Sequence, residues 1–125
     1  MPDPAGDQAL TAVHDARLLG TWQSDRWRTG REIAARGDIT AARKARLRRL
    51  FGRLVVRYTK TRCYATLDGE TNVRRYIVIA KDRSSAVVIL SDSVTGEPTI
   101  SHIHFQEQYY WISLGPIREY FRKIA

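Results

Sequence analysis

The sequence predicts a mainly β fold: an antiparallel up-and-down barrel or half-barrel of seven or eight strands, with a two-helix insert after the first strand. Three observations lead to this prediction. The chain has 125 residues, which suits one domain with a single core. From residue 53 onwards, apolar and polar residues alternate with a period of two. The turns between these runs are too short to hold crossover helices, so neighbouring strands must run antiparallel.

Six or seven strands are expected after the insert, each rich in valine, isoleucine or tyrosine and bounded by turn residues such as Asp68-Gly69 and Gly115-Pro116. Six of them cover residues 53–60, 62–67, 73–80, 85–91, 98–105 and 108–114, and residues 118–124 could form a seventh. A meander of this length avoids exposed edges by closing on itself, with the last strand beside the first. We therefore expect a small barrel or a strongly curled half-barrel, with residues 1–125 forming one domain.

The N-terminal part of the chain leads into the barrel and then changes period. Residues 1–7 are expected to be flexible, and residues 8–19 show a weak helical pattern. Residues 21–24 form the expected first strand. After it, apolar residues such as Trp27 and Ile33 recur at helical spacing, and Gly37 is expected to end that helix. These residues open the helical insert, which we place at residues 26–52.

The second helix of the insert combines an apolar stripe with a strongly basic surface. Asp38 or Thr40 can cap its start, and Gly52 can close it. The stripe consists of Leu47, Leu50, Phe51 and Leu54. The basic residues of this region, with no Asp or Glu among them, are Arg43, Lys44, Arg46, Arg48, Arg49, Arg53, Arg57, Lys60 and Arg62.

The composition narrows the classes of protein and partner. No apolar run approaches the ~20 residues that cross a bilayer, and no basic-then-apolar leader is visible, so we expect a cytoplasmic protein without a transmembrane segment. Cys63 is the one cysteine, which excludes an intrachain disulfide, a thiol-based zinc cluster and a two-cysteine redox motif. The net charge of +8 favours contact with acidic molecules or surfaces.

Four segments resemble a known superfamily. They are Gly20-Thr21-Trp22-Gln23-Ser24, His102-Ile103-His104-Phe105, Trp111-Ile112-Ser113-Leu114-Gly115 and Arg118-Glu119-Tyr120-Phe121. Together they resemble the lipocalin-like (calycin) superfamily, in particular small bacterial lipocalin-like proteins of uncharacterised function. The resemblance implies a barrel whose two helices cover one mouth, as in fatty-acid-binding proteins. It also implies that an arginine of the closing segment lies across Trp22 in a cation–π contact.

A candidate ligand site follows from the strand spacing. His102 and His104 are two residues apart, so their side chains share one face of a strand. If that face lines the interior, the pocket holds His102, His104, Tyr109, Trp111, Tyr120 and Arg122. Such a pocket suits a small anionic or aromatic molecule. In the alternative, the hairpin places Ile103, Phe105, Tyr110, Ile112 and Leu114 inside, and the histidines face solvent.

An enzymatic function also remains open at this stage. A small-barrel cyclase, isomerase or hydrolase could use His102 or His104 as a general base, with Tyr109 or Arg122 stabilising an anion. No nucleophile elbow, phosphate loop or paired-carboxylate motif accompanies these residues. Two histidines without an acidic neighbour make a poor metal site, so we expect no metal and no cofactor.

The basic residues 43–62 allow three interpretations. A solvated surface is the simplest, and no recognised motif indicates nucleic acid as the partner. The same residues could grip the phosphates of a nucleic acid or an anionic membrane. They could also steer an acidic ligand towards the barrel mouth, which is the interpretation we prefer.

The run Val87-Val88-Ile89-Leu90 is apolar on both faces of its strand, so a partner subunit could cover its outer face as a homodimer.

Overall fold

The computed structural model describes residues 14–92 and 94–125. The expected flexible residues 1–7 and the first half of the weak helical pattern at residues 8–19 lie outside this part, and residues 14–19 contain a turn and no helix. The strands are β1 (Gly20–Ser24), β2 (Val55–Tyr58), β3 (Arg62–Leu67), β4 (Glu70–Lys81), β5 (Ser85–Asp92), β6 (Pro98–Gln106), β7 (Tyr109–Leu114) and β8 (Ile117–Lys123). The helices are α2 (Arg26–Ala34) and α3 (Ala41–Leu50), both between β1 and β2.

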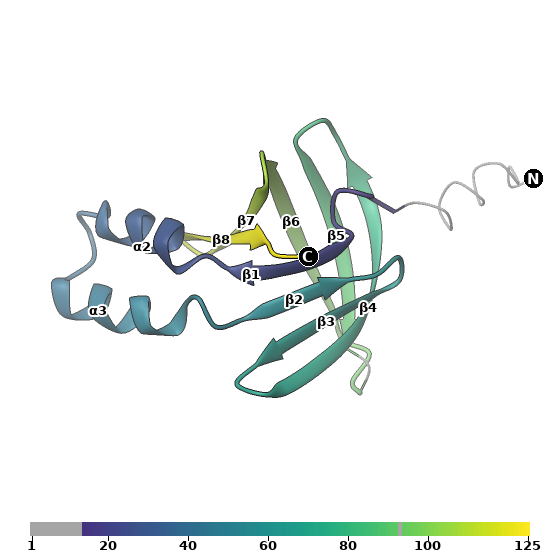
Figure 1. The fold of residues 1–125 in the computed structure, drawn as a ribbon, viewed down its shortest axis with the longest axis horizontal. Coiled ribbons are helices and arrows are strands. Elements are labelled where there is room, and N and C mark those ends of the chain that lie inside the picture. Colours follow the sequence, from purple (N-terminus) through teal and green to yellow (C-terminus); the bar gives the residue numbers. More distant parts are fainter. Residues whose placement is uncertain (1–13, 93) are drawn as a thin grey trace, which may run out of the picture.

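The strands form one closed antiparallel barrel in sequence order, and β8 returns to pair with β1 (Figure 1). At the closure, Trp22 lies opposite Lys123 and Ser24 lies opposite Phe121. The turn that joins β3 to β4 has two residues, Asp68 and Gly69, and both have positive φ, as a type I′ hairpin loop requires. The predicted meander and its closure are confirmed, with eight strands.

The two helices extend away from the barrel at the end where β1 stops (Figure 1). Asp25 caps α2, because its side chain accepts hydrogen bonds from the backbone N–H groups of Trp27 and Arg28. Thr29 and Ile33 are buried on the side of α2 that packs against β8. Neither helix is long and apolar enough to span a bilayer, as far as the described residues show.

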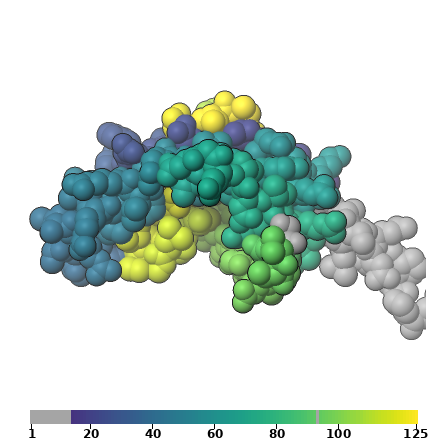
Figure 2. Space-filling model, turned by 90° about the horizontal axis from the view of Figure 1, so that it is seen from below, coloured from purple at the N-terminus to yellow at the C-terminus, as the bar shows by residue number. Residues whose placement is uncertain are grey.

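The second helix, α3, packs mainly against α2 and contributes no buried side chain. In Figure 2 it occupies one end of the molecule, in blue, beyond the strands. Thr40 is its N-cap, as expected, but the helix ends at Leu50 because Phe51 is already extended. The predicted apolar stripe is therefore wrong: Leu50 is 59% exposed, whereas Phe51 is buried outside the helix.

The barrel interior is filled by apolar and aromatic side chains. Tyr110 lies at the centre, edge-on to Trp22 at 4.8 Å and stacked on Phe121 at 4.9 Å between ring centroids. The Trp22 indole also donates a hydrogen bond to the backbone oxygen of Leu18 at 2.8 Å. The other members of this core are Val56, Tyr58, Cys63, Tyr76, Val78, Ala86, Val88, Leu90 and Ile103.

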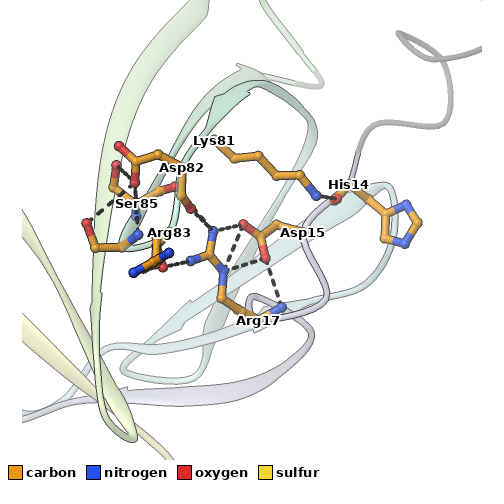
Figure 3. A network of polar contacts seen from close by, with 8 residues as sticks. His14, Asp15, Arg17, Lys81, Asp82, Arg83 and Ser85 are labelled. Atoms are coloured by element: carbon orange, nitrogen blue, oxygen red, sulfur yellow. Dashed lines mark hydrogen bonds and ion pairs between the residues drawn. The ribbon is translucent and has the colours of Figure 1, made fainter.

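The segment before β1 is tied to the turn between β4 and β5 at one end of the barrel (Figure 3). Arg17 is the centre of this network. Its guanidinium pairs with the Asp15 carboxylate at 2.6 Å and donates to the backbone oxygens of Asp82 at 3.0 Å and Arg83 at 2.7 Å. Arg17 also covers the ring of Phe105 at 4.3 Å. An ion pair with a buried carboxylate and a partly exposed guanidinium, together with its backbone partners, thus covers this end of the barrel.

One contact implied by the superfamily resemblance differs in the structure. The cation over Trp22 is Lys123, whose ammonium lies 5.7 Å from the ring centroid. Lys123 occupies this position because it is the partner of Trp22 in the β1–β8 register. Arg122 points to the opposite face and donates to Gln23, while Arg118 covers Trp111. The expected arginine–Trp22 contact is therefore wrong.

Candidate functional site

The β6–β7 hairpin turns its apolar residues inward. Ile103 is fully buried and Tyr110 is 2% exposed, whereas His102 is exposed. Since alternate residues of a strand face opposite sides, His104 and Trp111 lie on the outer face with His102. The expectation of an interior histidine pocket is wrong, and the alternative core is confirmed for Ile103 and Tyr110. The reason is solvation, because imidazole nitrogens in this aromatic core would lose water without gaining hydrogen bonds.

The outer face of β6, β7 and β8 carries a stacked row of four planar groups: His102, His104, Trp111 and Arg118. The His102 and His104 rings lie 4.0 Å apart, and His104 is parallel to Trp111 at 3.8 Å with an angle of 8°. The Arg118 guanidinium covers the Trp111 ring at 4.0 Å. The barrel register produces this stacking, since His104 and Trp111 are directly paired across β6 and β7.

A pocket of about 230 Å³ lies beside the stacked row, between α2 and the outer face of β6–β8. We call it the α2 pocket, and it is lined by Arg28, Arg31, Glu32, Gln106, Tyr109 and Tyr120. The Tyr120 hydroxyl donates to the Glu32 carboxylate at 3.1 Å. The Tyr109 and Tyr120 rings lie 5.9 Å apart, and Arg28 covers Tyr109 at 4.2 Å. Two cations and two phenol rings therefore meet at one small pocket.

The capping residue of α2 also positions one of these cations. The Asp25 carboxylate accepts a hydrogen bond from the Arg28 guanidinium at 2.7 Å. Burial would raise the pKa of Asp25, but the hydrogen bonds from the Arg28 backbone and side chain lower it overall. The same bond raises the pKa of Arg28. Asp25 thus stays ionised at neutral pH and holds Arg28 against the Tyr109 ring.

Two other groups of the site have shifted protonation equilibria. Burial raises the pKa of Tyr120, so its hydroxyl keeps its proton at neutral pH and remains a donor. Burial, together with the nearby His102 and Arg118, lowers the pKa of His104. His104 is therefore mainly neutral at physiological pH, with one ring nitrogen free to accept a proton or a hydrogen bond.

The six site residues predicted from the sequence separate into three groups. Tyr109 and Tyr120 line the α2 pocket, while His102, His104 and Trp111 belong to the stacked row. The sixth, Arg122, lies outside both groups and donates to Gln23 at 3.3 Å. The pocket and the row are adjacent, because the Arg118 side chain is 3.8 Å from the Glu32 carboxylate.

Sequence reasoning missed the residues that complete the site. The α2 residues Arg28, Arg31 and Glu32 belong to the helical insert, which we expected to cover the barrel mouth. Asp25 followed by Arg28 was the available signal, since a cap and a cation three residues later can form an ion pair. Nothing local indicated that α2 would dock on β8 beside Tyr120. That docking includes a hydrogen bond from the Tyr120 N–H to the Thr29 hydroxyl at 2.9 Å.

The fold and the site together define a small closed antiparallel β-barrel with a cationic, aromatic pocket on its outer face. Comparisons with protein-family models, with curated proteins and with solved structures found no match to this chain. The calycin resemblance accordingly remains a prediction from the sequence. Within residues 14–92 and 94–125, no group of three or more His, Cys, Asp and Glu side chains could hold a metal ion.

Proposed function

We propose that this protein is a lipocalin-like binding protein that takes up a small anionic organic molecule in the α2 pocket. One observation carries the proposal: Arg28 and Arg31 line the same pocket as the phenol rings of Tyr109 and Tyr120. Guanidinium groups bind carboxylate or phosphate through paired N–H donors. The tyrosine rings offer flat apolar contact to the rest of the molecule.

The size of the α2 pocket limits the ligand. Its volume of about 230 Å³ is below the ~300 Å³ at which pockets for drug-sized ligands begin. A fatty acid or a dinucleotide is too large, whereas a monocyclic carboxylate or phosphate ester suits the space. Since aromatic side chains such as Tyr110 fill the barrel centre, we assign binding to the outer face.

The charge of the chain supports the same ligand class. A net charge of +8 attracts anions over a distance of about one Debye length, roughly 8 Å at physiological salt. Glu32 lines the pocket as its acidic residue and already accepts from Tyr120. The proposal also keeps the cytoplasmic assignment, because the lone Cys63 is a buried free thiol that forms no disulfide.

The test uses benzoate and phenyl phosphate as probes. Nuclear magnetic resonance of the Tyr and Arg side chains detects their binding. We expect shifts confined to the α2 pocket, and Arg31→Gln should weaken binding about tenfold or more, the loss expected for one charged hydrogen bond. Arg83→Gln is the matched control, since it removes the same charge from the exposed turn between β4 and β5. Equal weakening by both variants would show general charge attraction and contradict the proposal.

One observation favours the enzymatic alternative. Burial, together with the nearby His102 and Arg118, lowers the pKa of His104 and favours its neutral form, which is the state a general base requires. If the protein is a hydrolase of this type, it should cleave 4-nitrophenyl acetate, and His104→Ala should abolish turnover while benzoate binding persists. Turnover that is absent from the unaltered protein, or unaffected by His104→Ala, removes this alternative.

A further inference from the structure

The helix α3 differs from every other element in its chemistry. Five of its ten residues are basic, and none of the ten is acidic. These basic residues are Arg43, Lys44, Arg46, Arg48 and Arg49. The helix buries no side chain, and its main contact with the rest of the molecule is with α2. A helix of this kind contributes little to the barrel core, so its composition calls for another explanation.

The arginines of α3 are also unengaged. Among residues 14–92 and 94–125, no carboxylate forms an ion pair with α3, and Lys44 donates to the backbone oxygen of Ala34. Two basic residues that follow α3 in the sequence have partners by contrast. Arg53 pairs with Asp68 at 3.0 Å, and Arg57 covers the Tyr64 ring at 4.1 Å. Four guanidinium groups of α3 are therefore available to an anionic partner.

The distribution of charge around α3 distinguishes two kinds of anionic partner. At 100° per residue, the basic positions spread around the whole circumference, and Arg43 lies between Leu47 and Leu50 on the helical wheel. A membrane surface contacts one side of a helix and requires an apolar face opposite a polar one. A nucleic-acid groove has phosphates on both walls, so it can engage cations on several sides of an inserted helix.

We propose that α3 is a nucleic-acid-binding helix that inserts into a groove of a duplex and grips the phosphates on both walls. The position of α3 permits this, because it forms one end of the molecule beyond the strands (Figure 2). An α-helix with its side chains is about 10–12 Å in diameter, which fits the ~12 Å width of the DNA major groove. Binding through phosphates is largely independent of base sequence and falls as salt rises.

The experiment measures fluorescence anisotropy of labelled DNA and RNA duplexes over a series of salt concentrations. The double variant Arg46→Gln/Arg49→Gln removes two cations while keeping residues that favour a helix. Its matched control, Arg75→Gln/Arg83→Gln, removes the same charge from β4 and the turn after it. We expect the α3 variant to bind about tenfold more weakly and its salt dependence to lose about two units of slope, one for each lost phosphate contact. The control should change both quantities much less.

Three outcomes would overturn the proposal. The first is equal weakening by the two double variants, which would mean that net charge alone governs binding. The second is retention on vesicles of phosphatidylserine without retention on either duplex, which would make a membrane the partner of α3. The third is the absence of duplex binding by the unaltered protein at low salt. Matching thermal unfolding curves for the two variants establish that both remain folded. Benzoate binding in the α2 pocket, measured in parallel, reports separately on the proposed function.

Discussion

Trp22 links several parts of the barrel. It lies on β1 at the closure with β8, packs edge-on against Tyr110 and donates to the backbone oxygen of Leu18. With 3% of its surface exposed, it stabilises the closure through both apolar burial and a buried hydrogen bond. In the sequence, Trp22 was identified from the segment Gly20-Thr21-Trp22. The structure gives the physical reason why this residue matters, which is its burial at the closure of the barrel.

Removal of Trp22 should therefore destabilise the whole barrel. We expect Trp22→Ala to lower the free energy of unfolding by about 3–5 kcal/mol, the range for deleting a large aromatic side chain from a core. Urea unfolding followed by circular dichroism measures this. Trp27→Ala is the control, because Trp27 is 68% exposed and should change stability by no more than about 0.5 kcal/mol. An unchanged urea midpoint for Trp22→Ala would contradict the assigned closure.

Glu119 is a second residue with a measurable signature. Its carboxyl is 6% exposed and accepts a hydrogen bond from the Ser24 hydroxyl at 2.8 Å. Burial raises its pKa, and the Ser24 bond offsets only part of that rise. Because the folded pKa exceeds the unfolded one, the contribution of Glu119 to stability is fully present below the ordinary value of 4.5 and is lost as pH rises through the folded pKa.

The variant Glu119→Gln removes this titration while keeping the shape of the side chain. We expect its stability relative to the unaltered protein to increase as pH rises from 4 towards 8, with the largest gain at the alkaline end. Urea midpoints measured across this pH range give the difference in stability between the two proteins. The contributions of the other carboxylates are common to both proteins and cancel in this difference. A difference that does not vary with pH would mean that Glu119 is as well solvated as in the unfolded chain.

At the scale of elements, α2 is the one whose local stability matters for the site. Its cap, Asp25, satisfies two backbone donors and holds Arg28 beside Tyr109. We expect Asp25→Ala to cost about 1–2 kcal/mol, the usual loss for an N-cap, and also to weaken benzoate binding. Asp38→Ala is the control, since Asp38 is exposed and pairs with Arg36 on the surface. Retained stability in Asp25→Ala would mean that docking on β8, rather than the cap, maintains α2.

The strands show which elements local patterns can predict. The boundaries expected for β3 agree with the structure, and β5, β6, β7 and β8 agree to within one residue at each end. The period of two and the turn residues are local properties, so they could be located without tertiary information. Leu114 is an exception, because it was expected in the core and is 44% exposed near the end of β7. The alternation of residues predicts which face of β7 carries Leu114, but it does not predict how far along the strand the barrel interior extends.

At the scale of the whole molecule, the outer face of β4, β5 and β6 carries an apolar row. Ile77 is paired with Ile89, and Ile89 is paired with Ile100 across these strands. Ile77 is 57% exposed and Ile100 is 67% exposed. Clustered apolar residues on a sheet face, unlike scattered ones, are typical of a subunit interface. The homodimer expected from residues 87–90 remains a prediction, and this row adds neighbouring residues of β4 and β6 to its proposed interface.

We expect the protein to dimerise through this row, and more strongly at high salt, since salt screens the repulsion between two chains of charge +8. The double variant Ile77→Thr/Ile100→Thr should be monomeric by sedimentation velocity while keeping residues that favour strands. Val94→Thr is the control, because Val94 is 91% exposed in the β5–β6 turn. A monomeric unaltered protein, or a dimer that survives the double variant, would contradict this assignment.

The sequence by itself determined the order and type of the elements and the meander of strands, and it named Tyr109 and Tyr120 as candidate ligand residues, although it placed them in the barrel interior. These follow from periodicity and turn chemistry, which act over a few residues. Only the tertiary structure decided that the histidines face outward and that Arg28 and Arg31 join the two tyrosines. The physical reason is distance along the chain: α2 and β8 are separated by more than 80 residues, and the periodicity that predicts the closed barrel does not indicate which strand a helix outside it will pack against.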